Sequence, residues 1–137
     1  MLSRRNFSAC AICAIAGFAA TGVITEAQAQ AAGLKRTILQ KTEVPNTNYV
    51  TILAMVEIDA GANVARHTHP GVESTYVVEG GLELSVKGEP VKAIKAGDGF
   101  QVPAETPHAA RNGDKLTKLI VTFVVDKDKP LASPAPE

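Results

Sequence analysis

Three histidines and one glutamate are the residues of this chain best suited to hold a metal ion. His67 and His69 stand at positions i and i+2 of a β-type run, so both imidazoles leave the same face of the strand. Their Cα atoms are about 6.6 Å apart in an extended chain, and both rings can reach one ion at about 2.1 Å. Glu73 follows after a Pro70-Gly71 turn, and His108 can add a third imidazole from a distant strand.

This donor set suits a borderline divalent transition metal such as Mn, Fe, Co, Ni, Cu or Zn. Four protein ligands on an octahedral ion leave two positions open to water or substrate. An isolated His-x-His pair is more often incidental than a pair of ligands. The whole chain, however, has only three histidines, and all three belong to this set. Their restriction to one group of positions favours a common site.

The elements that must position these residues are expected to be β-strands. From about Lys35 onward, short β-type runs alternate with turn residues, and no segment shows a convincing helical pattern. The Gly80-Gly81 and Asn112-Gly113 pairs are typical of tight turns, because both offer the positive φ that two-residue hairpins need. The predicted strands are Arg36–Val44, Tyr49–Ile58, Ala65–His69, Glu73–Glu79, Leu82–Val86, Val91–Lys95, Gly99–Val102, Pro107–Arg111 and Leu116–Val125. We therefore predict an all-β sandwich or barrel.

Apolar alternation predicts which faces of the strands are buried. Leu82, Leu84 and Val86 alternate with polar residues, which indicates a strand buried on one face. In the run Leu119-Ile120-Val121, apolar side chains point to both faces. Such a strand is buried on both sides or is covered by a second subunit. We expect a homodimer formed through Tyr49–Ile58 and Leu116–Val125.

The spacing of the candidate ligands, together with nearby glycines, resembles the two sequence motifs of the cupin superfamily. The positions that match the first motif are Gly61, His67, His69, Glu73 and Gly80, and those that match the second are Gly97, Pro103, His108 and Asn112. One position departs, because Glu105 stands where the second motif has glycine. If φ is positive there, a side chain costs about 1 kcal/mol.

The resemblance implies both a fold and a site. The fold is a double-stranded β-helix, or jelly roll, over residues 35–125. The site lies inside one end of this barrel, where one divalent transition metal would be held by His67, His69, Glu73 and His108. Flanking residues, including the Lys129-Pro130-Leu131 segment, also resemble a group of small exported cupins.

Two classes of function follow from the resemblance. The first is an enzyme, a metal-dependent oxidoreductase similar to quercetin-dioxygenase-like cupins. Its open coordination positions would bind a small chelating substrate and dioxygen, and Glu73 would also be the catalytic base. A cupin isomerase or lyase would use the same metal as a Lewis acid. The second class is a non-catalytic module that binds a metal or a small molecule, because a fold alone does not decide the chemistry.

Residues 1–29 are expected to be an export signal. Arg4-Arg5 precede Phe7, an apolar run covers Ala9–Ile24, and Ala27-Gln28-Ala29 has the small-x-small pattern of a cleavage site. The paired arginines resemble the twin-arginine type, and ordinary Sec export is the alternative. The apolar run of 16 residues is shorter than the ~20 residues that span a bilayer. We expect a periplasmic or secreted protein without a stable membrane anchor in its mature form.

Composition restricts the remaining possibilities. A chain of 137 residues is long enough for one domain. It balances 14 Lys+Arg against 14 Asp+Glu and is only 4% aromatic, which argues against a nucleic-acid-binding protein and favours a small-molecule ligand. Cys10 and Cys13 both fall in the expected signal. Residues 126–137 contain three prolines without apolar periodicity, so we expect a flexible C-terminal tail.

Overall fold

The computed structural model describes residues 32–136, and within them the chain forms ten strands and no helix. The expected export signal, residues 1–29, lies outside the described residues. The strands are β1 (Leu34–Glu43), β2 (Tyr49–Ile58), β3 (Asn63–Thr68), β4 (Gly71–Glu79), β5 (Gly81–Val86), β6 (Lys92–Lys95), β7 (Gly99–Val102), β8 (His108–Asn112), β9 (Thr117–Asp126) and β10 (Ser133–Pro134).

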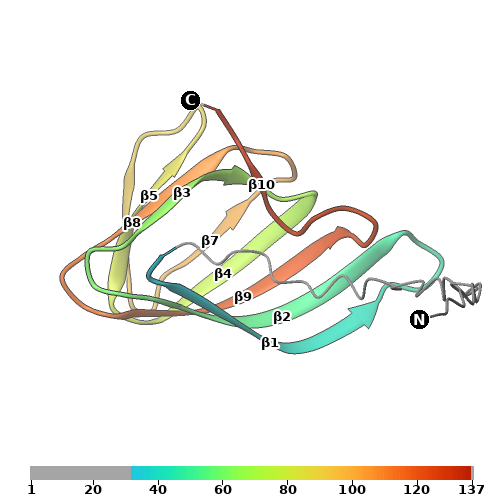
Figure 1. Cartoon of the computed structure of the whole chain (residues 1–137), viewed down its shortest axis with the longest axis horizontal. Helices are drawn as coiled ribbons and strands as arrows, with labels where there is room; N and C mark the ends of the chain where they lie inside the picture. The colour runs from blue at the N-terminus through green and yellow to red at the C-terminus, as the bar shows by residue number, and fades with distance from the viewer. Residues whose placement is uncertain (1–31, 137) are drawn as a thin grey trace, which may run out of the picture.

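The strands form two five-stranded sheets that face each other (Figure 1). Sheet A has the order β1-β2-β9-β4-β7, and sheet B has the order β10-β3-β8-β5-β6. The strand pairs within both sheets are antiparallel. Strands that are consecutive in the chain often belong to different sheets, as in a jelly roll. The predicted all-β, double-stranded β-helix is confirmed.

The core lies between the inner faces of the two sheets, and it follows the predicted alternation. In β2 every second residue from Val50 to Ile58 is buried, and the same holds in β9 from Thr117 to Val125. From sheet B, the predicted one-sided strand contributes Leu82, Leu84 and Val86 to the same apolar cluster. The inner face of sheet A is thus apolar along β2 and, apart from Thr117, along β9, and it packs against the apolar inner face of sheet B.

The two glycine turns connect sheets instead of forming hairpins. Gly80 alone separates β4 of sheet A from β5 of sheet B, and Asn112-Gly113 begins the passage from β8 to β9. The expected tight turn is present at Gly80, whereas neither Asn112 nor Gly113 adopts a positive φ. A sharp turn also does not specify which strand the chain then pairs with. Gly80 does adopt a positive φ of +78°, and a Cβ at this position would collide with Oγ1 of Thr117.

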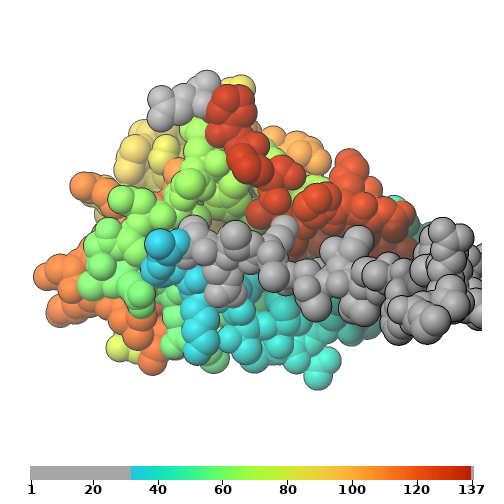
Figure 2. Space-filling model, in the orientation of Figure 1, coloured from blue at the N-terminus to red at the C-terminus, as the bar shows by residue number. Residues whose placement is uncertain are grey.

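The C-terminal segment returns across the edge of sheet B. In β10, Ser133 pairs with Thr68 and Pro134 pairs with His67. The backbone of Arg66 accepts a further hydrogen bond from Ala135 N. Figure 2 shows this red segment lying against the green surface that includes β3. These contacts were not predicted from the composition of residues 126–137.

A buried asparagine side chain ties the sheets together at one corner. The Nδ2 group of Asn112 lies within hydrogen-bond distance of the backbone carbonyls of Ile58 at 2.8 Å, Asp59 at 2.7 Å and Lys115 at 2.8 Å. Its Oδ1 lies 2.7 Å from Oγ1 of Thr117, which donates to it. Asn112 therefore fixes the end of β2 and the start of β9 relative to β8, the strand that carries His108.

We expect Asn112→Ala to lower the free energy of unfolding by about 2–4 kcal/mol, because it leaves several buried polar groups without a partner. Urea unfolding followed by circular dichroism measures this change. The control is Asn48→Ala, since Asn48 bonds to Asp126 and Asp128 in an exposed position, where the loss should stay below about 1 kcal/mol. Equal losses in the two variants would contradict the role given to Asn112.

Candidate metal centre

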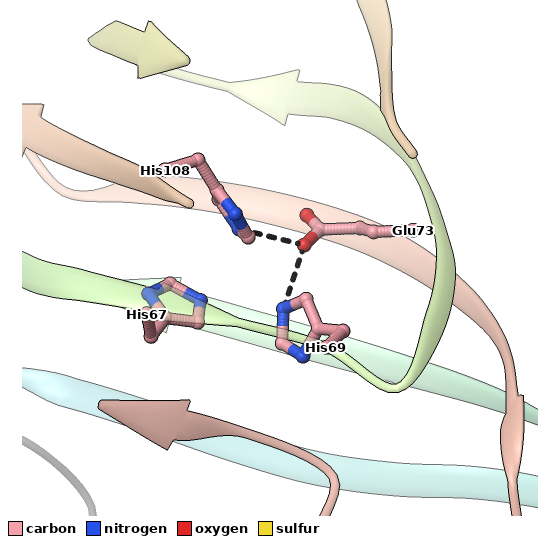
Figure 3. Close-up of side chains that lie close together, drawn as sticks. All are labelled: His67, His69, Glu73 and His108. Atoms are coloured by element: carbon pink, nitrogen blue, oxygen red, sulfur yellow. Dashed lines mark ion pairs between the residues drawn. The ribbon is translucent and has the colours of Figure 1, made fainter. Parts of the chain in front are cut away.

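The four predicted residues converge inside the barrel (Figure 3). His67 is on β3, His69 follows the end of that strand, Glu73 is on β4, and His108 begins β8. One donor atom from each lies within 4.8 Å of the donor atoms of the other three. The structure thus brings together every residue that the sequence singled out as a candidate ligand.

Strand pairing explains this convergence. His67 and His108 are direct partners in the antiparallel pair β3–β8, and their ring centroids are 4.2 Å apart. After His69 the chain crosses from sheet B to sheet A, where Glu73 is buried on the inner face of β4. The imidazoles therefore come from one sheet and the carboxylate from the other.

Each imidazole is oriented by a backbone carbonyl. Nδ1 of His67 lies 2.7 Å from Ala65 O, Nδ1 of His69 lies 2.6 Å from Leu131 O, and Nδ1 of His108 lies 3.0 Å from Thr106 O. A carbonyl oxygen can only accept a hydrogen bond, so each Nδ1 must carry the proton and donate it. In a neutral ring, Nε2 then keeps its lone pair and is the atom available to a metal ion.

The carboxylate of Glu73 is held from both sides. Oγ1 of Thr75 donates to Oε1 at 2.7 Å, while Oε2 lies 2.9 Å from Nε2 of His69 and 3.3 Å from Nε2 of His108. Two neutral imidazoles that donate through Nδ1 would direct lone pairs at this oxygen. A proton on Nε2 or a cation at the centre removes that repulsion.

The geometry fits a transition-metal ion. Donors at about 2.1 Å from a common ion lie roughly 3 Å apart when adjacent and roughly 4.2 Å apart when opposite. The observed upper limit of 4.8 Å is only slightly wider, so shifts of a few tenths of an ångström at each side chain close the set. Three nitrogens and one carboxylate oxygen are also the donor types that such ions accept.

The protonation states of the candidate ligands also suit metal binding. Burial alone raises the pKa of Glu73, but hydrogen bonds with His108 and His69 outweigh burial and bring it well below its ordinary 4.5. Burial, assisted by the nearby charge of His108, lowers the pKa of His67 to about 4. For His108, burial is the largest single influence and lowers the pKa, but the hydrogen bonds with Glu73 and the Thr106 carbonyl, together with the charge of Glu73, outweigh it, so the net shift is upward. At neutral pH Glu73 is ionised and His67 is neutral, as metal binding requires.

Three contributors to this centre were missed in the sequence. Thr75 shares the inner face of β4 with Glu73 because the two are two residues apart, and this period could have identified it. Arg36 occupies the inner face of β1 together with Leu34, where an inward charged residue interrupts an apolar alternation. The carbonyl of Leu131 had no sequence signal, because any residue type supplies a carbonyl.

Beside the candidate ligands lies a cavity of about 60 Å³. Its walls are largely apolar, and Phe123 on β9 forms part of them, with its ring centroid 4.8 Å from that of His69. This space would receive whatever molecule approaches an ion held by the four residues.

The turn before His108 adopts, at Glu105, a left-handed backbone conformation of the kind that favours glycine. The φ of Glu105 is +55°, and its backbone N donates to the carbonyl of His69 at 2.9 Å. The departure from the motif therefore changes the side chain but keeps the turn, and the turn supports one of the candidate ligands.

Comparisons with known proteins agree with this architecture. A family model for the cupin domain matches residues 54–125, more than half of the chain. No match was found among curated proteins.

Among solved structures, an RmlC-like cupin from Shewanella frigidimarina is 30% identical over 70% of this chain and 79% of its own, with a TM-score of 0.56. KdgF from a Halomonas species is 28% identical over 71% of this chain and 84% of its own, with a TM-score of 0.57. The DMSP lyase DddQ from Ruegeria pomeroyi is 25% identical over 62% of this chain, with a TM-score of 0.58. Because the match covers 43% of DddQ, this chain spans less than half the length of that lyase.

We expect Glu105→Gly to stabilise the protein by about 0.5–1 kcal/mol, because glycine removes a left-handed strain of about 1–2 kcal/mol and adds a smaller entropic cost on folding. The exposed pair between Glu105 and Lys129, at 3.9 Å, contributes little to offset this gain. Denaturant unfolding measures the change. Glu105→Ala is the control, since it removes the carboxylate and keeps Cβ; an equal gain in both variants would refute the strain argument.

Proposed function

This chain belongs to the cupin domain family, and from that premise we propose that it binds one divalent transition metal together with a small chelating organic molecule. The supporting observation is the arrangement of three imidazoles whose Nδ1 atoms donate to backbone carbonyls, which leaves Nε2 of each ring available around Glu73. The metal is drawn from Mn, Fe, Ni, Cu or Zn, since no thiolate is present among the donors to select a softer ion.

When bound, such an ion supplies Lewis acidity and, if it is redox-active, electron transfer to dioxygen. His67, His69 and His108 would hold it, with the hydrogen bonds to Ala65, Leu131 and Thr106 preventing the rings from rotating away. Glu73 would complete the set through Oε2 while Thr75 holds Oε1.

Glu73 is also our candidate for the base that accepts a proton from the substrate. Its hydrogen-bond partners stabilise the ionised form, which keeps it ready to accept a proton but makes it a weak base near neutral pH. We therefore expect turnover only with substrates whose own pKa falls on coordination, such as enols, phenols or carbon acids next to a carbonyl.

The first reaction class is a dioxygenase-like oxidoreductase acting on a small chelating substrate. A lyase is the second, and the likeness to the DMSP lyase DddQ, at 25% identity over 62% of this chain, favours it. A non-catalytic binding module uses the same residues and differs only in the absence of turnover.

Oxygen uptake and product analysis separate these classes. The metal-loaded protein is mixed with catechols, flavonols, diketones and small organic acids under air and under nitrogen. Oxygen consumption indicates the oxidoreductase, and product formation under nitrogen indicates the lyase or an isomerase. Binding in calorimetry without either indicates the module.

We further propose that the protein acts outside the cytoplasm, in the periplasm or as a secreted protein, on the strength of the signal pattern in residues 1–29. The described part of the chain contains no helix capable of spanning a membrane.

We also propose a homodimer that covers the outer face of sheet A. Met55, Ile120 and Tyr76 stand side by side across β2, β9 and β4, and Tyr76 is 53% exposed. The flanking row of Leu53, Thr122 and Ser74 carries no charge. An uncharged patch of this kind suits a self-complementary two-fold contact, and light scattering at micromolar concentration would show a monomer if the proposal is wrong.

Metal analysis is the first test of the proposed centre. We expect about one equivalent of metal in the purified protein and almost none in the double variant His67→Ala/His108→Ala, because two of the four donors are lost. Glu83→Gln is the matched control, since this carboxylate pairs with Arg111 on the surface and should leave metal content unchanged. Equal metal content in all three proteins would exclude the site.

Thr75→Val tests whether the hydrogen bond to Glu73 tunes the centre. Valine keeps the shape of threonine and removes the donor to Oε1, so metal affinity should fall by about 10- to 100-fold. Competition with a fluorescent chelator measures the affinity. Thr122→Val, on the outer face of β9, is the control and should retain the wild-type affinity; an unchanged affinity in Thr75→Val would show that the bond is dispensable.

A further inference from the structure

Arg36 brings a positive charge into the cavity beside the candidate metal centre. It lies on the inner face of β1, opposite Val56, and lines the same cavity as His67 and His69. Its Cζ atom is 5.7 Å from the centroid of the Phe123 ring, and that ring is in turn 4.8 Å from the ring of His69. The guanidinium therefore belongs to the site although β1 is far from the histidines in the sequence.

The charges that line this cavity are unbalanced once a divalent ion is bound. Among the described residues that line it, Glu73 is the acidic one, and Arg36 adds a positive charge of its own. One carboxylate leaves a divalent ion with a net positive charge, independently of the groups that Arg36 contacts. Excess charge in a partly buried site is costly unless a counter-ion is present, so the site favours an anionic ligand.

The other residues that line the cavity indicate the chemistry of the rest of that ligand. Leu34, Val64, Leu84 and Leu119 line the cavity and offer only apolar surface. A volume of about 60 Å³ is small beside the several hundred Å³ of sites that enclose drug-sized molecules. These features select a short molecule with a hydrocarbon body and charged or chelating ends.

We propose that Arg36 binds the carboxylate of a small organic acid whose second oxygen donor reaches the metal held by His67, His69, Glu73 and His108. Arginine suits this role because its planar fork of N–H donors matches the two oxygens of a carboxylate. This inference rests on the proposed metal function and names its substrate class: short aliphatic acids with two oxygen-donor ends, such as dicarboxylates or hydroxy acids.

Two other arginines in sheet B provide matched comparisons. Arg66 on β3 donates from Nε to the carbonyl of Pro136 at 3.1 Å and does not line the cavity. Arg111 on β8 pairs with Glu83 on the exposed face of sheet B. Of the two, Arg111 is the better control, because the charge of Arg66 acts on His108.

Calorimetry on the Zn²⁺-loaded protein tests the proposal without depending on turnover. The probes are malonate, succinate and glutarate, together with uncharged succinamide. We expect one of the diacids to bind, and Arg36→Met to weaken it by about 10- to 100-fold, as the loss of a charge-assisted bidentate contact predicts. Arg36→Lys should fall between them, Arg111→Gln should match the wild type, and succinamide should bind weakly to every variant.

Metal content separates failure of this inference from failure of the proposed function. Wild-type protein that takes up no Zn²⁺ would overturn the metal function itself. Wild-type protein that holds Zn²⁺ but binds none of the diacids, or binds them as tightly after Arg36→Met, would overturn the role of Arg36 alone. Loss of binding in Arg111→Gln instead of Arg36→Met would do the same. If Arg36→Met unfolds, Arg36→Gln, which keeps a polar planar group, is measured under the same criteria.

Discussion

The site depends on three hydrogen bonds in which histidine Nδ1 atoms donate to backbone carbonyls. Without them each ring could present either nitrogen, and nothing would direct three lone pairs at one point. Two of the carbonyls, of Ala65 and Thr106, lie two residues before their histidines, so local backbone geometry supplies them. The third belongs to Leu131, which is 62 residues from His69 along the chain. The C-terminal segment is thus part of the support of the centre.

The jelly-roll fold places the four candidate ligands close together. β3 and β8 place His67 and His108 opposite each other, and the crossing from sheet B to sheet A brings Glu73 in from the facing sheet. The corner at Asn112 fixes where β8 ends, and the left-handed turn at Glu105 ties the segment before β8 to the carbonyl of His69. The turn at this position does not require glycine, since Glu105 adopts a left-handed φ where the motif has that residue.

The candidate metal ligands could be predicted from the sequence, because they sit in short runs with a fixed period. His-x-His places two rings on one strand face, and Glu73 and His108 follow at motif spacings. The strands were predicted nearly in full for the same reason, since alternation is local. The connections between strands could not be predicted, because glycine turns do not encode which sheet receives the next strand. The pairing of the C-terminal segment could not be predicted, because that segment lacks a periodic pattern. The carbonyl partner of His69 could not be predicted, because any residue type supplies a backbone carbonyl.

The two sheets supply different functional groups to the site. Sheet B supplies the imidazoles, whereas sheet A supplies Glu73, Thr75, Phe123 and Arg36 from strands far apart in the chain. Substitutions on the inner face of sheet A can therefore change the charge and shape of the cavity while the imidazoles stay in place. A shared set of metal-binding residues consequently says little about the substrate among proteins of this fold. In this chain the substrate is best inferred from the residue that departs most from the apolar pattern of sheet A, which is Arg36.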